Sequence, residues 1–161
     1  MRYSDHYMQY HDIDWFCKIN NTPCHFASAG GLLPEPLMER KLLRKLQRDV
    51  CRAEYIYEEN EISYNEEFLR NRFRNDEEGK EAYIRSFKEM ARKGFVSFDR
   101  TNLSNSDDNT YHVVCYPKRR DRCVLSTDEL TDIGDIVYQY GDLILIIRVI
   151  LCTKLVIPRK H

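Results

Sequence analysis

A short run of alternating residues constrains the fold of this chain most strongly. Hydrophobic side chains occupy every second position in it: Ile13, Trp15, Cys17 and Ile19. Asn20 and Asn21 follow, and asparagine tolerates the positive φ angles that a type I′ turn requires. The pattern predicts a β-hairpin over residues 8–28 with a two-residue turn. In that register three pairs of residues face each other: Trp15 and Phe26, Cys17 and Cys24, Phe16 and His25.

Three helices are expected in the middle of the chain. After Pro34 and Pro36, an apolar stripe at steps of three and four residues predicts a helix over residues 36–58. Its members are Leu43, Leu46, Val50, Ala53 and Tyr57. Ser63 and Glu66 have the spacing of a capping box and predict that a second helix starts there. A third helix is expected over residues 77–93, with Gly94 just past its C-terminal end.

The remaining segments predict strands. Extended segments are expected at 95–99, 110–116 and 123–126, one helical turn at 127–134, and a hairpin formed by 136–140 and 143–157. The order indicates a single α+β domain over residues 1–161, a mainly antiparallel sheet with about three helices on one face. Its parts are an N-terminal hairpin (8–28), a helical segment (36–93) and C-terminal strands (95–157). The expected core contains Trp15, Phe26, Leu46, Val50, Phe87, Met90, Ile144 and Ile146.

Composition narrows the functional classes. The chain has 161 residues, 42% of them hydrophobic, and a net charge of -1, which argues against a general nucleic-acid binder. The longest apolar run, residues 143–151, is too short to cross a bilayer. No apolar secretory segment is visible at the start, so we expect a cytoplasmic protein whose six cysteines are reduced. No glycine-rich phosphate-binding motif occurs, and no cofactor is expected.

Residues 54–67 form the most informative functional feature. They contain six glutamates and three tyrosines and no lysine or arginine. They follow directly on a helix with a basic face, made by Arg40, Lys41, Arg44, Lys45, Arg48 and Arg52. Tyrosine supplies rigid contact area in protein interfaces, and carboxylates steer a basic partner. The segment therefore predicts one contiguous negative docking surface, with these partner-binding residues: Tyr55, Glu58, Glu59, Glu61, Tyr64, Glu66 and Glu67.

This surface favours a non-catalytic, cytosolic protein-binding module with a basic protein as its partner. A small single domain with an acidic patch and no cofactor motif has the physical profile of a bacterial toxin-neutralising (immunity-type) protein. That analogy rests on size and charge alone, and the sequence leaves the oligomeric state open. The competing interpretation of the same residues is a solvated helix end and loop.

A small, metal-dependent enzyme is the alternative hypothesis. Asp12 and Asp14 lie two residues apart on the expected strand, so both point to one face, and His25 shares that face across the hairpin. Two carboxylates and an imidazole can bind a divalent cation or form a base with its orienting partner. The competing interpretation is that the aspartates are solvated and His25 makes a structural hydrogen bond.

Two further interpretations rest on weaker patterns. Cys17, Cys24 and His25 offer three zinc ligands, but their spacing matches no standard zinc site, and paired core thiols explain the cysteines better. Residues 118–122 carry four basic side chains. Together with the basic face of the helix, they are a candidate phosphate-binding site. No recognised nucleic-acid signature accompanies them, so nucleic acid is not the expected partner.

Overall fold

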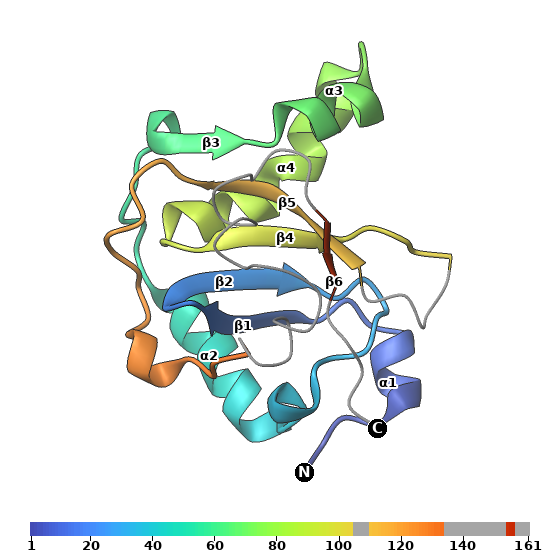
Figure 1. Ribbon diagram of the computed structural model, residues 1–161, viewed down its shortest axis with the longest axis vertical. Coiled ribbons are helices and arrows are strands. Elements are labelled where there is room, and N and C mark those ends of the chain that lie inside the picture. Colours follow the sequence, from blue (N-terminus) through green and yellow to red (C-terminus); the bar gives the residue numbers. More distant parts are fainter. Residues whose placement is uncertain (105–109, 134–153, 157–161) are drawn as a thin grey trace.

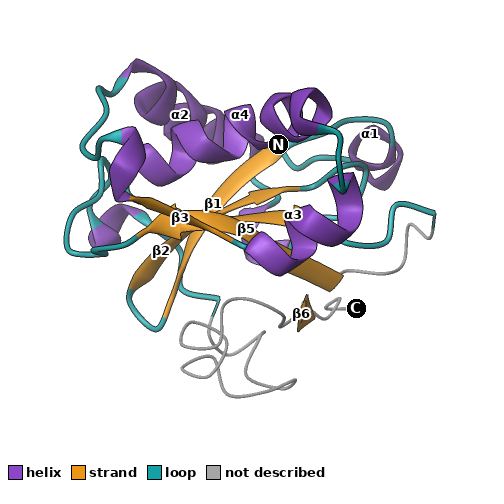
Figure 2. Ribbon diagram, turned by 90° about the horizontal axis from the view of Figure 1, so that it is seen from above, coloured by secondary structure: helices purple, strands orange, loops and turns teal. Residues whose placement is uncertain are grey.

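The structure, a computed structural model, describes residues 1–104, 110–133 and 154–156. In this part of the chain one α+β domain is built around a mixed sheet with the strand order β1-β2-β4-β5-β3, and β6 pairs with β5 beside this path (Figure 1). The strands are β1 (Asp14–Ile19), β2 (Thr22–Ala27), β3 (Ile62–Tyr64), β4 (Val96–Arg100), β5 (Thr110–Pro117) and β6 (Lys154–Val156). Helices α2 (Arg40–Arg52) and α4 (Glu77–Arg92) lie on one face of the sheet (Figure 2).

The N-terminal hairpin forms in the register that the alternation predicts. Trp15 pairs with Phe26, Cys17 with Cys24 and Phe16 with His25. Asn20 and Asn21 connect the strands with φ angles of 49° and 62°, as a type I′ turn needs. The hairpin is shorter than expected, because residues 5–9 form helix α1 (Asp5–Gln9), whose N-cap Ser4 accepts a hydrogen bond from Tyr7 N.

The expected helix at 36–58 is shorter at both ends. A 3₁₀ turn, η1 (Glu35–Leu37), precedes α2, and α2 ends at Arg52. Beyond it, the amides of Ile56 and Tyr57 donate to the carbonyl of Arg92 at the end of α4 (2.9 and 3.0 Å) instead of to helical carbonyls four residues earlier. Tyr57 is still buried, as the apolar stripe predicts, although it lies outside the helix.

The capping box predicted at Ser63 is wrong. Ser63 lies in β3, opposite Tyr116 of β5. The N-cap of α3 (Glu66–Phe73) is Asn65, whose Oδ1 accepts from Phe68 N at 3.2 Å while its Nδ2 donates to Val113 O at 2.9 Å. The third helix agrees with its prediction: α4 spans Glu77–Arg92, and Gly94 follows with φ 106°.

The sheet is mixed because the chain crosses over between β2 and β4. These two strands are parallel, with Phe26 beside Phe98, whereas the neighbouring pairs are antiparallel. Parallel neighbours need a long connection, and here residues 28–95 supply it and carry α2, β3, α3 and α4. The expectation of a mainly antiparallel sheet is therefore confirmed with one parallel pair.

Two expectations for the C-terminal part change. Residues 123–126 form no strand, and the helical turn expected at 127–134 is the 3₁₀ turn η3 (Thr127–Glu129), capped by Ser126 through Asp128 N. A further 3₁₀ turn, η2 (Glu59–Glu61), precedes β3. The hairpin expected at 136–140 and 143–157 lies outside the described residues except for β6, which pairs with the start of β5.

The core is centred on the sheet. Trp15 and Phe26 stack with ring centroids 4.1 Å apart, Phe26 and Phe98 at 4.5 Å, and Tyr111 meets Phe26 edge-on at 5.1 Å. Five of the expected core residues are buried, namely Trp15, Phe26, Leu46, Val50 and Phe87, and Met90 is partly buried. Ile144 and Ile146 lie outside the described residues.

Candidate docking surface and a buried histidine

The first half of the acidic segment is fixed to the C-terminal end of α4. Arg92 is its anchor: the Arg92 carbonyl accepts from Ile56 N and Tyr57 N, and the Arg92 Nε donates to Tyr57 O at 3.0 Å. The backbone that carries Tyr55 and the following glutamates is therefore held by the body of the domain. Side chains that project from it need less ordering when a partner binds than side chains of a free loop.

Glu58 and Glu59 project outward from this anchored backbone. Glu58 approaches Arg92 at 4.0 Å, and Glu59 approaches Lys88 at 3.5 Å and Arg92 at 3.8 Å. The two carboxylate side chains are 83% and 64% exposed, whereas those of Arg92 and Lys88 are only 17% and 19% exposed. The ion pairs thus present their negative members to solvent and keep their positive members beneath.

Tyr55 is an exposed aromatic ring in the same place. The residue is 47% exposed, and the Arg92 guanidinium carbon lies 3.8 Å from the ring centroid. A cation over an aromatic face at this distance holds the ring in one orientation. Tyr55 therefore combines solvent exposure with a fixed position, which is the property of an interface anchor.

Glu61 and Tyr57 have structural roles instead. One carboxylate oxygen of Glu61 accepts from Glu58 N at 2.9 Å and the other from Arg119 Nη2 at 2.9 Å. These two bonds, that to the Glu58 amide first, lower the pKa of the Glu61 carboxyl. The buried Tyr57 hydroxyl donates to Asp121 Oδ1 at 2.6 Å and accepts from Arg122 N at 3.1 Å, so it joins the acidic segment to the loop after β5.

The second half of the acidic segment lies elsewhere. Glu66 lines a cavity of about 200 Å³ with Lys80 and Glu77, at the N-terminal end of α4. Lys80 and Arg92 are separated by about 18 Å of helix, at 1.5 Å per residue. Glu67 is exposed in the first turn of α3, and Tyr64 is half-buried, which raises its pKa to about 12. The structure thus brings Tyr55, Glu58 and Glu59 together and places Glu66 apart from them.

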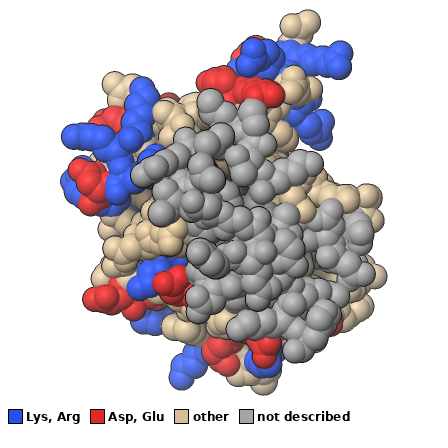
Figure 3. Space-filling model, viewed as in Figure 1, with Lys and Arg blue, Asp and Glu red and all other residues tan. Residues whose placement is uncertain are grey.

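Charge is also less segregated than the sequence indicates. Arg92, Lys88 and Arg119 lie against the carboxylates of Glu58, Glu59 and Glu61. Lysine, arginine and acidic side chains are intermixed around the margin of the face shown in Figure 3. The negative surface is accordingly a small group of outward carboxylates around Tyr55, and the basic neighbours come from α4 and the loop after β5.

The enzyme-like cluster is only partly assembled. His25 Nε2 lies 2.8 Å from Asp14 Oδ1, and Nδ1 lies 2.7 Å from Ser97 Oγ, so the three side chains form a row across β1, β2 and β4. His25 is 1% exposed and Ser97 is fully buried. Asp12 does not join them, because its Oδ1 accepts from Ala29 N at 2.8 Å. A buried serine cannot meet a substrate, and the row has the form of a structural hydrogen-bond network.

The zinc interpretation finds no support in the geometry. Cys17 and Cys24 face each other across the hairpin, whereas the ring nitrogens of His25 are taken by Asp14 and Ser97. Burial, followed by the hydrogen bond to Cys24, raises the pKa of the Cys17 thiol well above its usual value, and a metal needs the thiolate. In the described part of the chain no three His, Cys, Asp or Glu side chains are grouped to hold a metal.

Sequence reasoning missed the buried polar groups around β4 and β5. Tyr83 of α4 donates to Asp99 at 2.7 Å and lies 3.3 Å from His112 Nε2, and burial raises the pKa of both Tyr83 and Asp99. Arg100 is 3% exposed, and its Nε and Nη1 atoms have no hydrogen-bond partner among the described residues. Isolated polar residues within strands carry no motif, so only the three-dimensional packing reveals them.

Comparisons with known proteins identify no relative: no family model, no curated protein and no solved structure matches this chain. Among the helices in residues 1–104, 110–133 and 154–156, none is long and apolar enough to cross a membrane.

Proposed function

We propose that this protein is a non-catalytic, cytosolic binding module that engages a basic protein through Tyr55, Glu58 and Glu59. One observation carries the proposal: an exposed tyrosine, fixed by Arg92 at 3.8 Å, lies beside two outward-facing carboxylates on an anchored backbone. We call these three residues the docking triad. Glu61, Tyr64, Glu66 and Glu67 are outer positions that a large partner would also reach.

The chemistry of the docking triad suits a partner with lysine or arginine at its surface. Glu58 and Glu59 hold their own cations at 3.5–4.0 Å, which is loose for an ion pair. The guanidinium of a partner can form a shorter ion pair with Glu58 or Glu59. Tyr55 adds apolar contact area within the docking triad. Opposite charge then accelerates the encounter, and the aromatic contact retains the complex.

Binding fits these residues better than catalysis does. The row Asp14–His25–Ser97 is buried at its serine end and has both imidazole nitrogens occupied. Neutralisation of a basic toxic enzyme, as in immunity-type proteins, is the specific role that we propose for the docking triad. A stable complex of that kind would bury roughly 1,200–2,000 Å² in total, so it would extend beyond the triad.

Capture from a native lysate tests the proposal when it is done with matched variants. The immobilised protein should enrich one or a few basic proteins at about 50 mM salt, and the Glu58→Lys, Glu59→Lys double variant should lose them. The matched control is Glu77→Lys with Glu78→Lys in the exposed first turn of α4, which makes the same charge change elsewhere. Equal capture by all three proteins would remove the docking triad from consideration.

A second variant tests the aromatic anchor. Tyr55→Ala should weaken the captured complex by about 10- to 100-fold, mainly through faster dissociation, because truncation of an interface tyrosine typically costs about 1–3 kcal/mol. The melting temperature should stay close to that of the wild-type protein, since the Tyr55 ring is exposed. An unchanged dissociation rate would show that Tyr55 is not part of the interface.

A further inference from the structure

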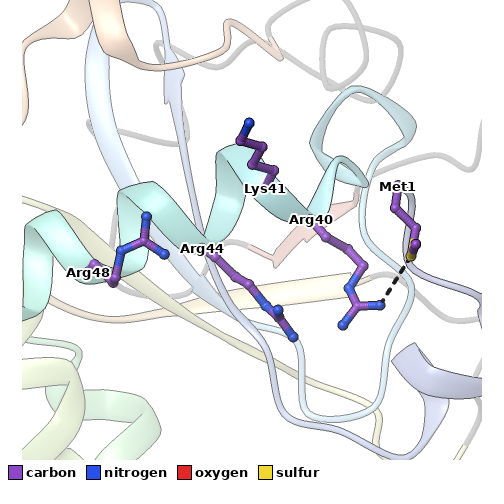
Figure 4. A pocket seen from close by; sticks show the side chains of 5 residues that line it. All are labelled: Met1, Arg40, Lys41, Arg44 and Arg48. Atoms are coloured by element: carbon purple, nitrogen blue, oxygen red, sulfur yellow. Dashed lines mark hydrogen bonds between the residues drawn. The ribbon is translucent and has the colours of Figure 1, made fainter.

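A second surface, on α2, has the opposite charge. Arg40, Lys41, Arg44 and Arg48 line a cavity of about 470 Å³ together with Met1. Arg40, Arg44 and Arg48 follow one another at intervals of four residues, so they form a row along the helix. In Figure 4 the side chains of Arg40 and Arg44 extend in the same direction, and Arg48 lies further along the same helix. We call these four residues the basic row.

Two arginines of the basic row have no direct charge partner in the part of the chain that the structure describes. Arg44 and Arg48 are exposed and form no hydrogen bond or ion pair with the described residues. Two neighbouring carboxylates have other contacts: Asp49 of α2 binds Lys45 at 2.6 Å, and the N-cap Glu39 accepts from Lys41 N at 3.2 Å and pairs with the N-terminal ammonium of Met1 at 3.1 Å. Free guanidinium groups in a concave site favour an anion.

Arg40 is the fixed end of the row. Its guanidinium carbon lies 5.2 Å from the ring centroid of Tyr3 and 5.6 Å from that of Tyr7, and its buried Nε has no hydrogen-bond partner in residues 1–104, 110–133 and 154–156. Tyr3 and Tyr7 are themselves stacked at 5.3 Å. This packing holds the Arg40 side chain in place before a ligand arrives, which lowers the entropic cost of binding.

The spacing of the arginines indicates the size of the anion. Successive arginines of the basic row are about 6 Å apart along the helix axis, and the three arginines span about 12 Å. A single phosphate reaches one or two guanidinium groups, whereas a chain of phosphates reaches all three. A cavity of about 470 Å³ is in the range of small-ligand sites. Arginine also matches phosphate oxygens in pairs, which lysine cannot do.

The loop after β5 is not part of this site. Arg120 and Arg122 line a different cavity, of about 310 Å³, with Asn21 and Thr127. The sequence suggested one phosphate-binding site made by residues 118–122 and the basic helix. In the structure these two groups of residues line two separate cavities. Of these two cavities, the one on α2 is lined by three regularly spaced arginines.

We propose that the basic row binds a small anion that carries two or more phosphate groups. The site uses Arg40 as the preorganised contact, Arg44 and Arg48 as the adaptable contacts, and Lys41 as an additional charge at the rim. It is independent of the docking triad, since it uses other residues of opposite charge. A soluble polyphosphorylated compound and a polyphosphorylated lipid headgroup share this chemistry.

Calorimetric titration of the full chain with inorganic triphosphate tests the proposal. Triphosphate should bind at least 10-fold more tightly than orthophosphate, and its affinity should fall as salt rises from 50 to 200 mM. The Arg44→Gln, Arg48→Gln double variant should lose at least 10-fold in affinity. The matched control is Arg70→Gln with Arg85→Gln, which removes the same charge from exposed positions on α3 and α4.

Vesicles distinguish the two sources of the phosphates. Binding of triphosphate, together with binding of phosphatidylcholine vesicles only when they contain a phosphoinositide bisphosphate, would assign a lipid headgroup. Binding of triphosphate without vesicle binding would assign a soluble compound. No triphosphate binding at 1 mM, or the same loss in both double variants, would overturn the site. Binding of a single-stranded oligonucleotide without triphosphate would also overturn it.

Discussion

His25 is a buried imidazole with both ring nitrogens bonded to side chains, at 2.7 Å from Ser97 Oγ and 2.8 Å from Asp14 Oδ1. Its hydrogen bonds connect three strands of the sheet. A substitution of His25 is therefore a clear way to distinguish a structural role from a catalytic one. In a structural role, the imidazole contributes to the stability of the fold and not to any activity.

We predict that His25→Ala lowers the free energy of unfolding by about 2–4 kcal/mol. The truncation leaves Ser97 without its partner in the buried sheet and leaves a cavity beside Phe16 and Phe87. Urea denaturation followed by circular dichroism measures the change. The control is His6→Ala at an exposed position in α1, where a change within about 0.5 kcal/mol is expected. Equal effects would contradict the structural role of His25.

Cysteine reactivity is the second prediction at the scale of residues. Cys51 is exposed, whereas burial raises the pKa of Cys123 to about 11 and those of Cys17 and Cys115 well above the usual value for a thiol. At pH 8 these three thiols stay protonated, and Cys17 and Cys115 are also buried, so among the cysteines that the structure describes iodoacetamide should modify Cys51 first. Because the reactive form is the thiolate, modification of Cys123 should still accelerate between pH 9 and pH 11.

Peptide mass spectrometry over a time course measures this order, with Cys51→Ala as the control for assignment. Faster modification of Cys17 or Cys115 than of Cys51 would show that the sheet opens far more readily than its packing indicates. Prior reduction should not change the order, because we also predict that the native protein contains no disulfide. A lower thiol count before reduction than after it, under denaturing conditions, would contradict that prediction.

At the scale of elements, the hairpin turn is a direct test of the predicted register. Asn20 and Asn21 both have positive φ, at 49° and 62°. Asn21→Val should destabilise the protein by about 1–2 kcal/mol, because a β-branched residue is strained in the left-handed region. Asn21→Gly should be neutral or stabilising, since glycine adopts that conformation freely. A thermal melt of both variants measures the difference, and equal melting temperatures would contradict the turn assignment.

Elements with local patterns could be predicted from the sequence, and elements fixed by distant contacts could not. The hairpin register follows from alternation and two asparagines, and α4 follows from its apolar stripe and Gly94. The end of α2 could not be predicted, because the Arg92 carbonyl, far along the chain, takes the amides of Ile56 and Tyr57. The cap of α3 could not be predicted either, because Asn65 is also held by hydrogen bonds to β5, a strand far along the chain.

The candidate site shows the same division. The exposure of Glu58 and Glu59 could be predicted from their local sequence, and their position over Arg92 and Lys88 could not. The sequence places Glu66 eight residues after Glu58, and the fold takes it to the other end of α4. Residues that are close in sequence are therefore not all close in space, and we propose Tyr55, Glu58 and Glu59 as the centre of the docking surface.

At the scale of the whole molecule, the two charged surfaces make opposite predictions for salt. A net charge of -1 gives no strong overall field, so steering depends on local groups. The carboxylates of the docking triad attract cations, and the basic row attracts anions. Charge reversal at the docking triad should leave triphosphate binding unchanged, and the Arg44, Arg48 double variant should leave capture of a basic protein unchanged.

The association rate of a captured basic partner, measured against ionic strength, tests the central claim most directly. At about 50 mM salt the Glu58→Lys, Glu59→Lys double variant should associate at least 10-fold more slowly than the wild-type protein, and the Glu77→Lys, Glu78→Lys control should not. The difference should shrink towards 0.5 M salt, because the Debye length falls from more than 10 Å to less than 8 Å. Wild-type association that is indifferent both to salt and to the double reversal would contradict a docking surface at Tyr55, Glu58 and Glu59.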